Sequence, residues 1–252
     1  VVDDQTGRTN WLTPSGAPVA PSKSQKKLRK NLNFKDLESI SQRKIISVKR
    51  FAKYIVIRLD NDNYLIVHLG MSGRLKFYLN EYYKKEKHDH VVLQFDKFKI
   101  VFNDPRRFGM FFRLEDINEV EIFFNNYGTD LLVNKVKTQE IYDKFIGKKV
   151  SLKQALLNQS LIVGIGNIYA NEALFHSRLS PLRLTNSLNL AELTQLISPC
   201  KFVLKLSLKN GGSSINDYKS PDGTLGSFQS LFKVYQKKHV LYKKKSYKIK
   251  KI

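Results

Sequence analysis

Residues 163–172 have the types and spacing of a phosphate-binding turn. Gly164 and Gly166 permit positive φ and a close approach of the backbone, and a helix that opens at Asn167 would direct its unpaired N–H groups and its dipole outward. Upstream, residues 151–157 have the apolar pattern of a short helix. The segment therefore predicts a helix–two-turn–helix unit that binds an anion, although such a turn also serves as a plain connector.

The charge of the chain favours a polyanionic partner. The 44 Lys and Arg residues against 22 Asp and Glu residues give a net charge of +22 over 252 residues. Such a surface binds nucleic acid by neutralising phosphates and releasing counterions. A merely solubilising charge and a membrane surface are the weaker alternatives. Since the sequence shows neither a signal peptide nor a run of roughly 18 apolar residues, we expect a cytoplasmic, nucleoid-associated protein.

Cysteine and histidine are scarce. Cys200 is the only cysteine, which excludes a disulfide within the chain and a cysteine-based zinc site. Of the five histidines, only His88 and His90 have the spacing of a metal pair. Alternation along a strand would place both on one face, where contact with a phosphate or a base is as plausible as coordination. We expect no metal and no other cofactor.

The elements that must position these residues change character along the chain. Apolar runs at 54–59 and 64–69 flank a polar turn, and runs at 90–95 and 98–102 flank another, which predicts two hairpins. From residue 116 to about 210 helical periodicity takes over, with a long helix from Leu190 that ends at Gly211. The sequence predicts an α+β fold in which an antiparallel β half precedes a helical half.

Three motifs then occur in a familiar order: His-Leu-Gly-Met-Ser-Gly at 68–73, Asp-Pro-Arg-Arg-Phe-Gly at 104–109, and the glycine turn at 164–172. On these motifs the chain resembles the formamidopyrimidine-DNA glycosylase family, the bifunctional DNA glycosylase/AP lyases, from about residue 28 to residue 235. The resemblance implies a β-sandwich domain at 28–115, a helix–two-turn–helix domain at 116–235, and DNA between them. It leaves residues 1–27 unmatched, as a flexible segment, and 236–252 as a basic tail or a degenerate zinc finger.

The family extrudes the damaged base from the duplex, and the resemblance assigns residues that fill the gap. Met71 and Phe108 would enter the vacated stack as apolar wedges, and Arg106 would hydrogen-bond the orphaned cytosine. The alternative is that Met71 and Phe108 are ordinary core residues and that Arg106 forms a salt bridge within a turn.

Further residues match positions that contact phosphates or close over the lesion. Lys53 is the catalytic candidate, matching a lysine that approaches the lesion, although it could be one more solvated charge. The candidate DNA contacts, beside the wedge residues, are His68, His88, Lys153, Gly166 and Asn167. The loop at about 213–229, with the composition of a mobile lid, would close over the base through Ser214, Tyr218, Gly223 and Phe228.

Both ends depart from the family pattern. Family members open with a proline, whose amine attacks the sugar C1′, followed by a glutamate, whereas this chain opens Val1-Val2-Asp3-Asp4. At the other end, Tyr242 and Lys245 have the spacing of the first cysteine pair of the family's zinc finger but are not zinc ligands. The lysine-rich end favours a loose basic tail over a zinc-free hairpin.

Pro199 is a third departure, because it falls within a segment that the family keeps helical. Proline inside a helix costs about 3 kcal/mol unless it begins a new helix.

The functional prediction has one main form and two alternatives. The main form is a base-excision repair protein that excises oxidised purines, such as 8-oxoguanine and formamidopyrimidines, from duplex DNA and incises at the abasic site, acting as a monomer. Since the proline and glutamate have no match here, a non-catalytic remnant that binds damaged DNA is the first alternative. An RNA-binding or ribosome-associated helix–two-turn–helix protein is the second.

Overall fold

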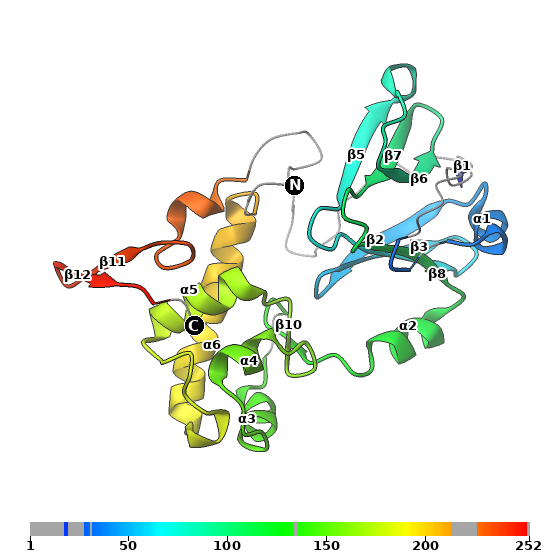
Figure 1. The fold of residues 1–252 in the computed structure, drawn as a ribbon. Helices are drawn as coiled ribbons and strands as arrows, with labels where there is room; N and C mark the ends of the chain where they lie inside the picture. The colour runs from blue at the N-terminus through cyan, green and yellow to red at the C-terminus, as the bar shows by residue number, and fades with distance from the viewer. Residues whose placement is uncertain (1–17, 20–27, 31, 134–135, 213–225, 251–252) are drawn as a thin grey trace. The chain divides into compact units, whose positions relative to one another are not determined.

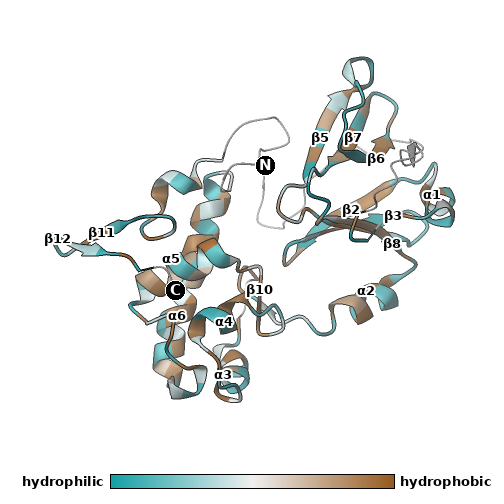
Figure 2. Ribbon diagram, viewed as in Figure 1, coloured by the Kyte–Doolittle hydropathy of each residue, from teal (hydrophilic) through white to brown (hydrophobic). Residues whose placement is uncertain are grey.

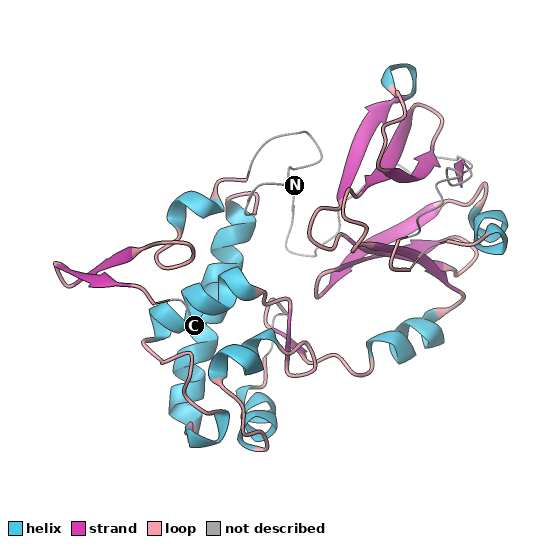
Figure 3. Ribbon diagram, viewed as in Figure 1, coloured by secondary structure: helices cyan, strands magenta, loops and turns pink. Residues whose placement is uncertain are grey.

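The computed structural model describes residues 18–19, 28–30, 32–133, 136–212 and 226–250. Two compact units divide these residues, one up to Asn125 and one from Asn126 onward. Strands predominate in the first unit and helices in the second (Figures 1 and 3). This is the α+β fold that the sequence predicted.

The first unit contains two four-stranded antiparallel sheets. One sheet has the order β1-β6-β7-β5 and the other β2-β3-β4-β8. The strands are β1 (Pro18–Val19), β2 (Ile45–Phe51), β3 (Tyr54–Leu59), β4 (Tyr64–His68), β5 (Arg74–Leu79), β6 (Asp89–Gln94), β7 (Phe98–Asn103) and β8 (Met110–Leu114). Both predicted hairpins are present, as β3–β4 and β6–β7.

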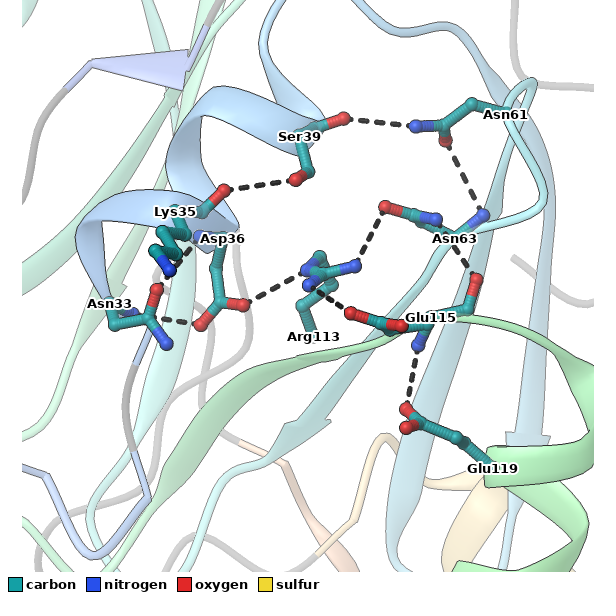
Figure 4. Close-up of polar contacts among 9 residues, drawn as sticks. All are labelled: Asn33, Lys35, Asp36, Ser39, Asn61, Asn63, Arg113, Glu115 and Glu119. Atoms are coloured by element: carbon teal, nitrogen blue, oxygen red, sulfur yellow. Dashed lines mark hydrogen bonds and ion pairs between the residues drawn. The ribbon is translucent and has the colours of Figure 1, made fainter.

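Buried side chains of helix α1 (Phe34–Ile40) and of both sheets form one hydrophobic core, which includes Leu65, Val67, Phe102 and Phe111. A capping box between Asn33 and Asp36 starts α1. Asp36 also accepts a hydrogen bond from Arg113 Nε on β8 at 2.9 Å, which ties the helix to the sheet within the polar network of Figure 4.

Helix α2 (Ile117–Phe124) belongs to the first unit. The ring of Phe124 contacts Phe51 at a centroid distance of 4.5 Å, and that of Phe123 contacts Phe112 at 5.3 Å. The structure thus divides after Asn125, ten residues later than the boundary drawn from periodicity, because aromatic packing attaches α2 to the sheet.

The second unit is helical. Its elements are β9 (Thr129–Asp130), α3 (Thr138–Ile146), α4 (Leu152–Leu157), β10 (Ile162–Val163), α5 (Asn167–Ser177), α6 (Leu190–Lys209), β11 (His239–Tyr242) and β12 (Lys245–Lys248). Short 3-10 helices lie at Asn80–Tyr82, Thr185–Ser187 and Phe228–Leu231. Capping boxes start α4 and α6, through Ser151 with Gln154 and Asn189 with Glu192.

Helix α6 is continuous through Pro199 and ends before Gly211, as the breaker predicted. Its buried side chains, including Leu196 and Cys200, form one core with those of α3, α4 and α5, and apolar residues recur along α6 in Figure 2. Burial raises the pKa of the Cys200 thiol to about 12, so the thiol stays protonated at neutral pH. Among the described helices, none combines the length and the apolar character needed to cross a membrane.

The lysine-rich end forms a hairpin, which corrects the preference for a loose tail. Strands β11 and β12 pair from His239↔Lys248 to Tyr242↔Lys245, around a two-residue turn in which Lys243 and Lys244 have positive φ. Two left-handed residues are characteristic of the tight type I′ turn, whose twist suits a hairpin. The hairpin is mainly hydrophilic in Figure 2, and backbone pairing together with the Tyr242–Tyr247 ring contact holds it.

Candidate nucleic-acid interface

Two loops of the first unit lie side by side because of the strand order. Residues 69–73 cross from β4 to β5, and residues 104–109 cross back from β7 to β8. Strand β4 pairs with β8, and β5 pairs with β7. At each end, therefore, one loop is attached to a strand that neighbours the strand to which the other loop is attached. Pairing of His68 with Met110 and of Arg74 with Asn103 places the two loops at one end of the unit.

The backbones of these loops are in direct contact. Gly70 has a φ of +66°, and a Cβ there would lie 2.8 Å from both the Gly109 nitrogen and the Phe108 carbonyl carbon. A Cβ on Gly109 would likewise lie 2.9 Å from the His68 oxygen. Only glycine allows this approach, so the two motifs recognised in the sequence form one structural feature.

The proposed wedge residues lie on these loops and face solvent. Met71 is 64% exposed and Phe108 is 52% exposed, and Arg106 is also exposed. Side chains this exposed are not part of the hydrophobic core, and an apolar pair on two adjoining loops suits a binding surface. The alternative that Met71 and Phe108 are ordinary core residues is therefore wrong.

Lys53 and His68 lie at the same end of the unit. Lys53 occupies the turn between β2 and β3, and the next residue, Tyr54, pairs with His68. Although the Lys53 side chain is partly exposed, desolvation by the surrounding protein lowers its pKa. Burial, and then the positive charges of Lys53 and Arg29, lower the pKa of His68. The Gly70 N–H donates to His68 Nδ1 at 3.1 Å, which in the neutral ring leaves the proton on Nε2, a donor of the kind that a phosphate accepts.

The structure separates His88 from His90. Strand β6 begins at Asp89, so His88 lies before the strand, whereas His90 is buried within it with Nε2 2.8 Å from the Asp104 oxygen. Because His88 lies outside the strand, the alternation that would place both rings on one face does not apply to this pair. His88 nevertheless lies next to the loop 104–109, since its carbonyl oxygen accepts a hydrogen bond from the backbone nitrogen of Asp104 at 3.0 Å.

In the second unit, the structure brings Lys153 and Asn167 together. Both line a groove of about 980 Å³, Lys153 from α4 and Asn167 from the first turn of α5. The groove has further basic lining residues, namely Arg178, Lys237 and Lys250. Its charge and the helix N-terminus suit an anionic ligand.

In the glycine turn before α5, only one of the two glycines has the positive φ that was expected of both. Gly164 has a φ of +86°, but Gly166 has a φ of −116° and is the N-cap of α5, so it does not serve through positive φ. The Gln159 side chain braces the turn, accepting from Gly164 N at 3.0 Å and donating to the Ile165 oxygen at 3.1 Å.

Only one proposed lid residue lies in the described part of the chain, and it belongs to the core. Phe228 is buried, with ring contacts to Tyr169 at 5.8 Å and Phe232 at 5.3 Å. Its assignment to a mobile lid is therefore wrong, because it packs against α5. Ser214, Tyr218 and Gly223 lie outside the described residues.

Glu172 is a further residue of this unit that the sequence reasoning missed. Its buried carboxylate accepts from the backbone nitrogens of Lys233, Val234 and Tyr235 at 2.8, 3.0 and 2.8 Å. The bonds attach α5 to the segment that leads into the hairpin β11–β12. The sequence shows Glu172 within the third motif, but it does not show which distant residues Glu172 contacts.

The hairpin does not suit the zinc ion that the family resemblance implies. Tyr242 and Lys245 form the closing pair of its turn, and the Arg178 guanidinium lies 5.4 Å from the Tyr242 ring. Over the residues that the structure describes, His, Cys, Asp and Glu side chains nowhere gather in threes as metal ligands would. The residues present therefore do not fit a structural zinc site.

Comparison with known proteins identifies the family. Residues 15–111 match the formamidopyrimidine-DNA glycosylase N-terminal domain, and residues 127–219 match the formamidopyrimidine-DNA glycosylase H2TH domain. The chain is 42% identical over 204 residues to formamidopyrimidine-DNA glycosylase of Wolbachia sp. subsp. Brugia malayi, an alignment that covers 80% of this chain and 74% of the relative. The Zymomonas mobilis enzyme is 40% identical, over 77% of this chain and 71% of the relative. The chain belongs to the formamidopyrimidine-DNA glycosylase family.

Solved structures support the same fold. The complex between Lactococcus lactis Fpg and DNA containing an abasic site superposes with a TM-score of 0.80 at 23% identity, covering 93% of this chain and 90% of that one. A variant of the same protein bound to DNA containing Fapy-dG gives a TM-score of 0.81 at 22% identity, with the same coverage.

Proposed function

We propose that this protein acts in base-excision repair, recognising oxidised purines in duplex DNA, excising them and incising at the resulting abasic site. The observation that carries the proposal is the pair of adjoining loops that hold Met71 and Phe108 exposed beside Arg106. Extruding a base costs a few kcal/mol of stacking and pairing, and apolar side chains that enter the gap offset this cost. The family and its DNA complexes support the same function.

The roles follow from chemistry and position. Met71 and Phe108 replace the lost stacking, and the Arg106 guanidinium donates to the orphaned cytosine, since a guanidinium matches base acceptors. His68, His88, Lys153 and Asn167 contact phosphates, with Gly166 at the start of α5. Lys53 approaches the lesion. We further propose that the protein acts as a monomer on nucleoid DNA.

Borohydride trapping tests the chemistry. An amine that attacks the sugar C1′ forms a C–N bond as the glycosidic bond breaks, and the base leaves with the electron pair and takes up a proton. Cleavage of the C1′–O4′ bond then gives an iminium, which borohydride reduces to a stable adduct. The protein is incubated with a duplex carrying one 8-oxoguanine or one abasic site. We expect a covalent adduct, and strand nicks without reductant. Retention of damaged duplex without adduct would mark a damage-binding protein that does not cut, and preference for RNA would overturn the DNA assignment.

Replacing the three wedge residues tests the recognition. We expect the variant Met71→Ala, Arg106→Ala, Phe108→Ala to lose its preference for damaged over undamaged duplex, because little else would fill the vacated stack. Salt-sensitive binding to undamaged DNA should remain, since phosphate contacts carry it. Affinities for both duplexes at several salt concentrations give the result, and an unchanged preference would remove these residues from the interface.

A further inference from the structure

A fully buried carboxylate lies where the two wedge loops, residues 69–73 and 104–109, adjoin. Asp104 is 0% exposed, and both of its oxygens accept hydrogen bonds, Oδ1 from Ser72 Oγ at 2.5 Å and Oδ2 from Gly109 N at 2.8 Å. The two donors stand on opposite loops, one residue after Met71 and one after Phe108. Asp104 begins the second loop, so its bond to Gly109 holds the turn of that loop, and its bond to Ser72 joins the two loops. Since a buried carboxylate needs its hydrogen bonds, separating the loops would leave Oδ1 unsatisfied.

Ser72 links the same loops a second time. Its buried hydroxyl donates to Asp104 and accepts from the backbone nitrogen of Arg106 at 3.1 Å. Asp104 is itself anchored to its own sheet, because its backbone nitrogen donates to the His88 oxygen at 3.0 Å and its backbone oxygen lies 2.8 Å from His90 Nε2. The network therefore runs from strand β6 through Asp104 and Ser72 to all three wedge positions.

We infer that Asp104 and Ser72 are positioning residues that hold Met71, Arg106 and Phe108 as one preformed unit, so that filling the stack and reading the orphaned base occur together. This inference rests on the proposed function. Neither side chain touches DNA, because both are buried.

The physical gain is preorganisation. Two independent loops would each lose conformational freedom on binding, and that cost would reduce the affinity for the extruded state. Loops joined by satisfied buried hydrogen bonds have already lost that freedom on folding. The coupling also gives Ser72, which follows Met71, an influence on how Arg106 discriminates the opposite base.

The test uses Ser72→Ala and Asp104→Asn, with two matched controls in the same unit. Asp36→Asn alters a carboxylate that also accepts two hydrogen bonds, and Ser39→Ala removes a hydroxyl that bonds only to its own helix (Figure 4). We expect Ser72→Ala and Asp104→Asn each to lower the preference for damaged duplex by about tenfold, as losing a buried hydrogen bond of this class would. The affinity of the test variants for undamaged DNA should equal that of the wild type. The control variants should keep the wild-type preference for damaged duplex.

Two further readouts separate positioning from mere stability. A 2-aminopurine placed opposite the lesion changes its fluorescence when the wedge residues enter the stack. The amplitude of this fluorescence change should be smaller for Ser72→Ala than for the wild type. Discrimination between cytosine and adenine opposite the lesion should weaken in Ser72→Ala, but not further when Arg106→Ala is already present, because the two residues act together. Ser72→Thr, which keeps the hydroxyl, should restore both signals.

A lowered melting temperature with unchanged preference, fluorescence and base discrimination would overturn the inference. Additive effects of Ser72→Ala and Arg106→Ala would do so as well. If the triple wedge variant kept its preference, the assignment of the wedge residues would fail, and with it the inference. If the wild-type protein showed no preference for damaged duplex, the proposed function itself would fail. If only the triple variant lost its preference while Ser72→Ala kept it, the positioning role alone would fail.

Discussion

At the scale of single residues, environment decides what each side chain can do. Met71 and Phe108 are apolar but exposed, whereas Asp104 and Glu172 are carboxylates but buried. The apolar pair suits a stacked duplex, and the buried carboxylates organise backbone around them. Residue type alone would have suggested the reverse for each.

His68 gives a prediction about pH. Its folded-state pKa is lowered from 6.5, first by burial and then by Lys53 and Arg29. Between the two pKa values the unfolded chain binds more protons, so the free energy of unfolding falls as pH drops through about 6.5 toward the folded-state pKa. His68→Asn, whose amide oxygen can accept from Gly70, should reduce this loss.

Denaturant unfolding between pH 5 and pH 8 measures the effect. Lys53→Met removes one of the charges that lower the pKa and should also reduce the pH dependence. Identical pH profiles for wild type and His68→Asn would contradict the assignment.

At the scale of elements, local signals set the helices and strands, and a few buried polar bonds join them. Capping boxes start α1, α4 and α6, and the polar turns close the predicted hairpins. The hairpin β11–β12 joins the helical core through Glu172 and through Arg178 over Tyr242.

Glu172→Gln should loosen this attachment. The amide keeps the shape but places an NH2 group where the carboxylate accepted a backbone N–H, with a loss of about 1.5–3 kcal/mol for a charge-assisted bond. We expect faster amide exchange at residues 233–235 and in the hairpin, measured by hydrogen exchange with mass spectrometry. The control is Glu140→Gln, an exposed glutamate on α3. Unchanged exchange at residues 233–235 would show that Glu172 does not hold the segment.

At the scale of the whole molecule, the net charge of +22 attracts DNA, but only contacting charges should set the salt dependence. Lys153→Gln removes a proposed phosphate contact and should reduce the slope of log K against log salt by about 1. Lys137→Gln changes the net charge equally but replaces a lysine paired with Glu140 at 2.8 Å. Its slope should match wild type, and equal slopes for both variants would mean that Lys153 contacts no phosphate.

The sequence by itself determined the class of fold, the two hairpins, the long helix from Leu190 and the family, whereas the continuity of that helix through Pro199 came from the structure. Each follows from signals close along the chain: period-two apolar runs, capping residues, glycine breakers and three ordered motifs. It did not reveal that α2 packs with the first unit, that Phe228 is a core residue or that the basic end forms a hairpin. Packing partners far along the chain decide these.

The tertiary structure alone decided how the site is assembled. The motifs at 68–73 and 104–109 adjoin because β4 pairs with β8 and β5 with β7, a strand order that no local pattern shows. The same order buries Asp104 where the two loops adjoin and leaves Met71 and Phe108 exposed. Burial and long-range hydrogen bonding are properties of the packed chain, and for that reason Ser72 and Asp104 emerged only with the fold.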